Sequence, residues 1–340
     1  MQIKSIFLHH IDVQTNIVTS IEIDDDAENL IDYVEKLVDD ILDNANRRSY
    51  NWKDGHTQVK NSLIHLYEES DDVEEYVLEN AKRLLEKEVK SQKLIAKLNI
   101  EIQKGSLLHL AIENNGVHQT IICKVEHDEV ISEINFDLIR GLNTKKKLFK
   151  AILVHYDIDG NITHNYIHDK NSTKYWWDDF LELEKTKTDE ENTENSLNDL
   201  DIAIGRYKKK YPSDHLILRN SLIGYYRSNE NMNYTDMFDS IFKNYEPRDN
   251  DFPKKQLLKV IKSLPSKENF ETQFPIIKSK INKRKNTKIK LANNLYLGFD
   301  GEVHNIENII KTYSEGGNKY IRILSTEGYE KLKHLKSNND

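Results

Sequence analysis

Two runs of basic residues offer phosphate-binding chemistry in a chain whose formal net charge is −8. The first, RYKKKY, begins at Arg206 and sets three lysines between Tyr207 and Tyr211, although an ordinary solvated helix face would have the same composition. The second, KSKINKRKNTKIK over residues 278–290, contains no acid. A run of cations in an extended or loop conformation neutralises several phosphates and releases condensed counterions. We predict that the following side chains contact the phosphates of double-stranded DNA: Arg206, Lys208, Lys209, Lys210, Lys278, Lys280, Lys283, Arg284, Lys285, Lys288 and Lys290.

The acidic total hides a segregation of charge along the chain. Between Lys254 and Lys290 there are twelve Lys and Arg against two acids, which gives +10. Between Asp178 and Asp201 there are ten acids against two lysines, which gives −8. Phosphate contacts carry no base-reading code, so we expect DNA binding with little sequence specificity. We expect the two tyrosines of RYKKKY to pack at the sugar-phosphate edge.

A calcium loop is the first metal site to test, because YDIDGN has oxygen-bearing side chains at alternate positions. An EF-hand loop also needs Gly at its sixth position and an acid at its twelfth, but Ile162 and His168 stand there. A hairpin turn at Asp159-Gly160 explains the same residues. We predict no metal and no cofactor.

Enzyme chemistry has little support in the sequence. A two-metal nuclease needs acids that converge on Mg²⁺, often beside a lysine, and the strand pair with Glu113 and Lys124 lacks the second acid. There is no P-loop and no nucleophile elbow. The single cysteine, Cys123, lies in an apolar run and is predicted to be a buried structural thiol. We therefore predict a protein without catalytic residues.

The first 185 residues have the pattern of an α+β domain. Short β-rich runs at the N-terminus precede apolar stripes of helical period that begin near Ala27 and Val73, and further β-rich runs follow. This order favours a sheet with packed helices over an alternating βαβ sheet. The segment STKYWWDDFLEL is predicted to form a helix that Ser172 or Thr173 caps and whose aromatic residues anchor it.

A polar, acidic linker is predicted at residues 186–195. Residues 196–340 form the expected second domain, mainly helical to about 264 and β-containing after Pro265, with NIENIIKTY as a helix-like segment between strands. The fold prediction is thus an α+β chain with an N-terminal sheet, a helical segment and a small C-terminal β region.

The order of several segments resembles the bacterial nucleoid-associated protein family, that of the 37-kilodalton nucleoid-associated protein. The segments are IKSIFLHHID, KGSLLHLAIENNGVHQTIICKVEH, YWWDDFLEL, FETQFPIIKSKI, KIKLANNLYLGFDG and GGNKYIRILSTEGYEKL. The resemblance covers almost the whole chain, and it rests on the order and spacing of these pieces. It implies a cytoplasmic, nucleoid-located DNA-binding protein that acts with DNA-maintenance machinery, and it supplies no catalytic residues.

A different class remains open, namely a non-catalytic interaction subunit of a bacterial DNA-maintenance or phage-defence complex, whose acidic N-terminal half docks a partner protein. The N-terminus lacks the apolar core of a signal peptide, and no apolar stretch approaches the ~20 residues that span a bilayer. We expect a cytoplasmic protein with no membrane partner, and a homodimer is compatible with the sequence.

Overall fold

The structure is a computed structural model with an α+β fold, and it divides the chain into two compact units. It describes residues 1–24, 27–96, 102, 104–131, 138–142, 149–169, 173–281, 286–300, 303 and 305–335. Unit 1 comprises Met1–Asn192, Asn231–Thr235 and Asn269–Pro275. Unit 2 comprises Thr193–Glu230, Asp236–Glu268 and Ile276–Asp340. No helix in these described ranges has the length and apolar character that crossing a membrane requires.

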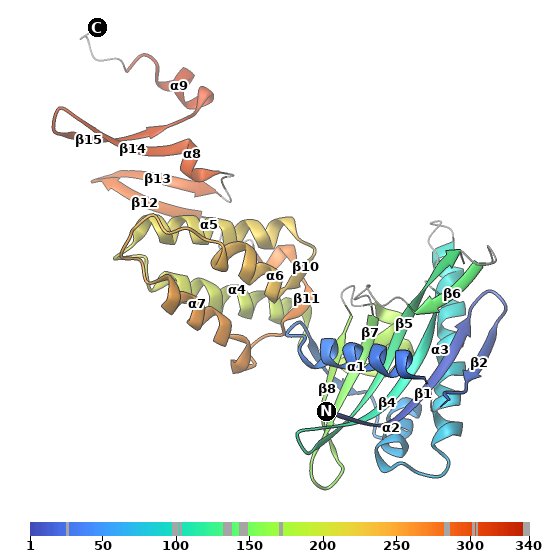
Figure 1. Cartoon of the computed structure of the whole chain (residues 1–340). Coiled ribbons are helices and arrows are strands. Elements are labelled where there is room, and N and C mark those ends of the chain that lie inside the picture. The colour runs from blue at the N-terminus through green and yellow to red at the C-terminus, as the bar shows by residue number, and fades with distance from the viewer. Residues whose placement is uncertain are drawn as a thin grey trace. The chain divides into compact units, whose positions relative to one another are not determined.

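An antiparallel sheet, of nine strands in the described part of the chain, forms the centre of unit 1 (Figure 1). The strands are β1 (Gln2–Asp12), β2 (Ile17–Ile21), β3 (Arg48–Trp52), β4 (Gly105–Asn114), β5 (Val117–Ile131), β6 (Leu138–Leu142), β7 (Phe149–Tyr156), β8 (Ile162–His168) and β9 (Leu183–Lys185). Their order is β2-β1-β4-β5-β7-β8-β3-β9, and β6 pairs with β5. The predicted sheet is confirmed.

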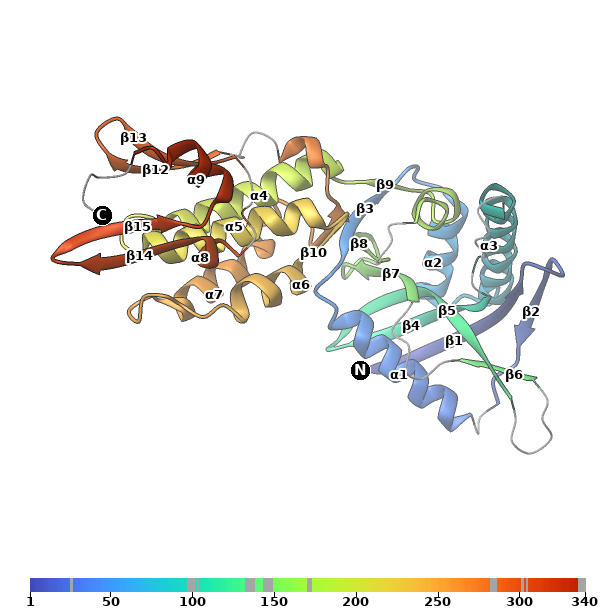
Figure 2. The same cartoon turned by 90° about the horizontal axis from the view of Figure 1, so that it is seen from above.

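Helices cover both faces of this sheet, and Figure 2 shows α1 on one side and α2 with α3 on the other. They are α1 (Glu28–Leu42), α2 (Gln58–Glu68), α3 (Val73–Ile95) and the π-helix η2 (Tyr175–Phe180). Successive residues of β4 point to opposite faces of the sheet, so the strand contributes to two hydrophobic cores. Leu108 and Leu110 pack with α1 on one face, and Leu107 and Ala111 pack with α2 and α3 on the other. Each fully buried aliphatic side chain contributes about 1.5–3 kcal/mol.

The helix predicted within STKYWWDDFLEL is shorter than expected and is capped differently. It begins at Tyr175 after Lys174, and no side chain caps it. Thr173 is therefore not the capping side chain, and Ser172 lies outside the described residues. The aromatic anchors are confirmed, since Trp176 and Phe180 are fully buried.

The segment predicted as an acidic linker contains the start of a helix. The helix α4 (Asp189–Gly205) opens with a capping box, in which the Thr188 hydroxyl accepts the Glu191 N–H and the Glu191 carboxylate accepts the Thr188 N–H. Acids in the first turn also interact favourably with the helix dipole. The acidic composition of residues 186–195 thus marks a helix N-terminus as well as a unit boundary.

The predicted helical character of the segment up to about residue 264 is confirmed. After α4 come α5 (Pro212–Ser228), α6 (Tyr234–Phe238), the π-helix η3 (Asp239–Lys243) and α7 (Lys254–Ser263), followed by short 3₁₀ turns η4 (Pro265–Lys267) and η5 (Lys278–Lys280). Two pieces of the second half belong to unit 1: the pair β10 (Asn231–Asn233) and β11 (Gln273–Pro275). The Thr272 hydroxyl, next to β11, forms hydrogen bonds with the backbone of Ala45 and Arg47 and so connects this pair to the N-terminal part of unit 1.

The chain continues as two antiparallel hairpins in unit 2. The first is β12 (Asn286–Ala292) with β13 (Leu295–Asp300), and the second is β14 (Ile310–Glu315) with β15 (Asn318–Ile323); the short helices are α8 (Ile306–Ile309) and α9 (Thr326–Leu332). The helix predicted over NIENIIKTY is wrong beyond its first turn, because β14 begins at Ile310. Two adjacent left-handed glycines, Gly316 and Gly317, close the second hairpin in the manner of a type I′ turn.

Candidate nucleic-acid interface

The two units carry opposite net charge. Unit 2 contains 26 Lys and Arg against 18 Asp and Glu, which gives +8. Unit 1 contains the remaining 23 Lys and Arg against 39 Asp and Glu, which gives −16. The acidic stretch 178–201 extends past the boundary at Asn192, but most of the basic stretch 254–290 belongs to unit 2. Polyanions are attracted to the second unit and repelled by the first.

The run RYKKKY forms the turn between α4 and α5, so the alternative interpretation as a helix face is wrong. Arg206 and the three lysines are exposed. Tyr211 is only 6% exposed, because its ring packs against Phe252 and its hydroxyl donates to the Asp251 carbonyl. Tyr207 also packs on Phe252. The expected packing of Tyr211 on a sugar-phosphate edge is therefore wrong, since that ring belongs to the core.

Acidic groups lie close to the end of this turn. A pocket of about 410 Å³ beside Tyr211 is lined by Asp214, Arg248, Asp249 and Asp251, among others. The pKa of Lys210 is raised, mainly by a hydrogen bond with Tyr211 and further by the charges of the last two aspartates. The negative charges of these aspartates act on Lys210, whereas the exposed Arg206, Lys208 and Lys209 do not line this pocket.

Lys278 has a structural role in unit 2. Its ammonium group donates to the carbonyls of Tyr226 and Arg227, both at 3.1 Å, and to that of Asn229. A cation that binds the free carbonyls at a helix C-terminus stabilises the helix. Lys280 instead makes a partly exposed ion pair with Glu194 at 3.3 Å.

Replacing Lys278 by Met should lower the free energy of unfolding of unit 2 by about 1–2 kcal/mol, because the α5 carbonyls lose a charged donor. Lys280→Met is the matched control, since a partly exposed ion pair contributes at most about 1 kcal/mol. Urea unfolding followed by circular dichroism measures both. Equal stability of the two variants would refute the capping role.

The β12–β13 hairpin exposes a basic face. Lys288 and Lys290 are exposed, alternate along β12 and form no ion pair within the described ranges. Tyr296, which is 56% exposed, lies directly across from Lys290. Phe299 lies on the opposite face of the hairpin, and its side chain is only 8% exposed. The predicted contacts Lys283, Arg284 and Lys285 lie outside the described residues.

A third set of lysines was not singled out from the sequence. Lys255, Lys259 and Lys262 are exposed on α7, while Leu257 and Ile261 are buried. The spacing i, i+4, i+7 puts the three cations on one side of the helix. The sequence KKQLLKVIKS carries this signal, because its lysines recur with the same helical period as its apolar residues.

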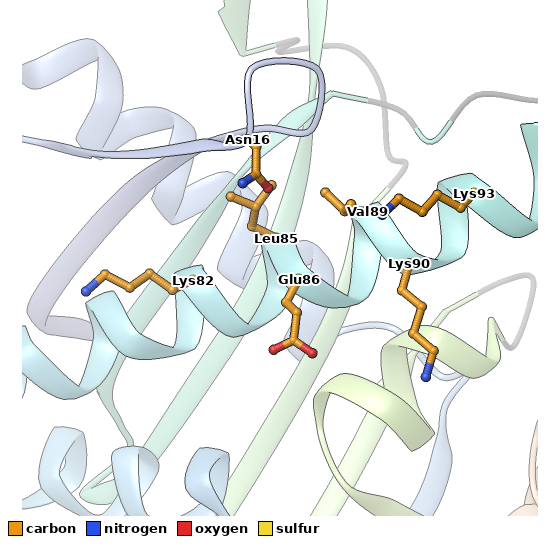
Figure 3. A pocket seen from close by; sticks show the side chains of 7 residues that line it. All are labelled: Asn16, Lys82, Leu85, Glu86, Val89, Lys90 and Lys93. Atoms are coloured by element: carbon orange, nitrogen blue, oxygen red, sulfur yellow. The ribbon is translucent and has the colours of Figure 1, made fainter.

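Unit 1 has a surface groove of about 410 Å³ on α3, shown in Figure 3. Its sides include Asn16, Leu85, Val89, Lys90 and Lys93. The labelled lysine side chains spread away from one another instead of converging on one point. The groove therefore lacks a common centre for a phosphate.

A cluster of buried charges lies between α3 and the sheet. Glu88 of α3 is fully buried and pairs with Lys124 of β5, which is 3% exposed. Beside them, Lys150 lies 3.5 Å from the carboxylate of Asp169. Burial, followed by the negative charge of Glu88, raises the pKa of Tyr175, whose hydroxyl lies 3.4 Å from that carboxylate. The acid that pairs with Lys124 thus comes from a helix, whereas Glu113 lies beside Lys4 at the other end of β4.

Two further predictions, the buried Cys123 thiol and the Asp159-Gly160 turn, agree with the structure. Cys123 is buried, which raises the pKa of its thiol. The predicted hairpin turn is confirmed, because the Asp157 carboxylate accepts the N–H groups of Asp159 and Asn161 and Gly160 has a positive φ. Within the part of the chain that the structure describes, no three His, Cys, Asp or Glu side chains are placed to hold a metal ion.

The chain matches no protein-family model and no curated protein.

Proposed function

We propose that the protein binds double-stranded DNA through its phosphates, with little sequence specificity, as a cytoplasmic, nucleoid-associated protein without catalytic activity. The observation that carries the proposal is the exposed face of β12–β13, where Lys288 and Lys290 stand two residues apart on one strand. Alternate residues of a strand lie on one face about 7 Å apart, so both ammonium groups can reach the backbone of one duplex.

The charge of unit 2 supports this proposal. Its +8 attracts a polyanion, and the acidic unit 1 keeps non-specific contacts away from the remaining surface. Exposed cations of the α4–α5 turn and of α7 belong to the same unit. The resemblance to the nucleoid-associated family points to the same function and adds DNA-maintenance proteins as partners.

The variant Lys288→Ala/Lys290→Ala should bind duplex DNA about tenfold more weakly, and the slope of log affinity against log salt should become shallower by about 1.8, or 0.9 for each lost contact. Surface changes of this kind alter the free energy of unfolding by about 0.5 kcal/mol or less, so the fold should survive. Fluorescence anisotropy with two labelled duplexes of unrelated sequence measures affinity across a salt series, and both duplexes should show the same loss.

The matched control is Lys82→Ala/Lys93→Ala, which removes the same charge from exposed positions of α3 in unit 1. It should leave the affinity and the salt slope unchanged. Equal losses in the two double variants would mean that net charge alone governs binding. Absence of salt-dependent binding by the unmodified protein would refute the proposal and favour the interaction-subunit alternative.

A further inference from the structure

The second hairpin, β14–β15, has a face that combines two cations with two tyrosines. The register pairs Lys311 with Arg322 and Tyr313 with Tyr320. Alternate residues of a strand share a face, so these four side chains lie together on one side of the hairpin. The other side bears Ile310, Ile321 and Ile323 together with Thr312, Ser314 and Lys319.

The two tyrosines form a stacked and exposed pair. Their ring centroids are 4.9 Å apart and their planes are inclined by 15°. The Arg322 guanidinium lies 4.7 Å from the centre of the Tyr313 ring, which places it over the aromatic face. Tyr313 is 37% and Tyr320 40% exposed, so a substantial part of each ring remains accessible to a ligand.

The two cations of this face lack acidic partners. Lys311 and Arg322 are exposed, and neither makes an ion pair within the described ranges. Like charges directly opposite each other destabilise a strand pair. An anion bound between the two side chains relieves this repulsion, and the arginine fork suits phosphate geometry.

We propose that this face is a stacking platform for unpaired nucleotides: Tyr320 stacks on a base while Lys311 and Arg322 hold the adjacent phosphate. The inference rests on the proposed DNA binding and refines its substrate to duplexes that carry a single-stranded segment. A base pair inside a duplex has both ring faces covered by its neighbours, so away from the duplex ends only an unpaired base can stack on a tyrosine. Two residues along a strand span about 7 Å at the backbone, and the Arg322 guanidinium reaches to 4.7 Å from the centre of the Tyr313 ring, so one nucleotide can contact a ring and a cation together.

The test compares a blunt labelled duplex with the same duplex carrying a single-stranded oligothymidine tail, by fluorescence anisotropy at one salt concentration. The unmodified protein should bind the tailed duplex about tenfold more tightly, as expected for stacking of one base. Lys311→Gln/Arg322→Gln retains both tyrosines and should lose this preference while it binds the blunt duplex as before. Tyr313→Phe/Tyr320→Phe retains both rings and should keep the preference.

Ultraviolet cross-linking gives a readout that does not depend on affinity. A tail that contains bromouracil should cross-link within β14 or β15 when the peptides are mapped. Salt-dependent binding of the blunt duplex without a preference for the tail, or cross-links only outside this hairpin, would overturn the platform and leave the proposed function standing. No binding of either DNA would overturn both.

Discussion

The variant Lys124→Met should lower the free energy of unfolding of unit 1 by about 3–5 kcal/mol, because it leaves the Glu88 carboxylate charged and without its partner inside the protein. Glu88 is fully buried and Lys124 is 3% exposed. Neither group exchanges its partner for water while the unit remains folded. The Tyr175 hydroxyl, at 3.4 Å from the same carboxylate, is too distant to replace an ammonium group.

Tryptophan fluorescence during urea unfolding isolates this effect, since Trp52, Trp176 and Trp177 are the three tryptophans of the chain and all belong to unit 1. The double variant Glu88→Gln/Lys124→Met should recover most of the loss, because removal of both charges from a buried pair is often neutral. Lys82→Met is the control, with an exposed pair to Glu79 that contributes about 0.5 kcal/mol or less. A loss below about 1 kcal/mol in Lys124→Met would mean that water reaches this ion pair.

The same pair shows what the sequence could not predict. Glu88 stands in an amphipathic helix where a glutamate is ordinarily solvent-exposed, and Lys124 directly follows the apolar residues Ile121, Ile122 and Cys123 of β5. The two residues are 36 positions apart, and nothing in either segment indicates its partner. Long-range pairing of this kind depends on how α3 is placed on the sheet, which periodicity does not specify.

Local patterns predicted most of the secondary structure. The apolar stripe that begins near Ala27 corresponds to α1, and the β-rich run around Cys123 corresponds to β5. Burial of one face makes apolar residues recur every 3.6 residues in a helix and every 2 residues in a strand. The start of α4 was also readable in the capping box at Thr188, but the acidic composition of that segment favoured a linker.

The candidate interface was predicted only by composition, and composition does not distinguish exposed cations from engaged ones. Lys278 and Lys288 belong to the same basic run, yet the first caps α5 and the second lies exposed on β12. The hairpin cations Lys311 and Arg322 were missed, because they are eleven residues apart and only the strand register brings them face to face. Charge counts therefore locate the basic unit more reliably than its contact residues.

His168 alone should cost unit 1 about 3 kcal/mol of stability as the pH falls from about 6.5 to about 4, because this buried histidine binds a proton on unfolding. Burial, and secondarily the charge of Arg47, lowers the pKa of His168 from 6.5 to about 4, although the Asn46 backbone partly offsets this. A histidine whose pKa is lowered in the folded state contributes stability that is complete above the unfolded pKa and decreases as the pH falls towards the folded pKa. Burial also lowers the pKa of His9, His109 and His155, which acts in the same direction.

The histidine contribution can be separated from that of the carboxyl groups. Asp12 and Glu113 also have lowered pKa values, but their ordinary values are 3.8 and 4.5, so their effect begins only near the acid end of this range. Urea unfolding followed by tryptophan fluorescence, at a series of pH values between 7 and 4.5, should show a steady fall in the unmodified protein and a smaller fall in His168→Gln. His56→Gln changes an exposed histidine of the same unit and should keep the full fall. A His168→Gln variant with undiminished pH dependence would show that the proton taken up on unfolding belongs to other groups.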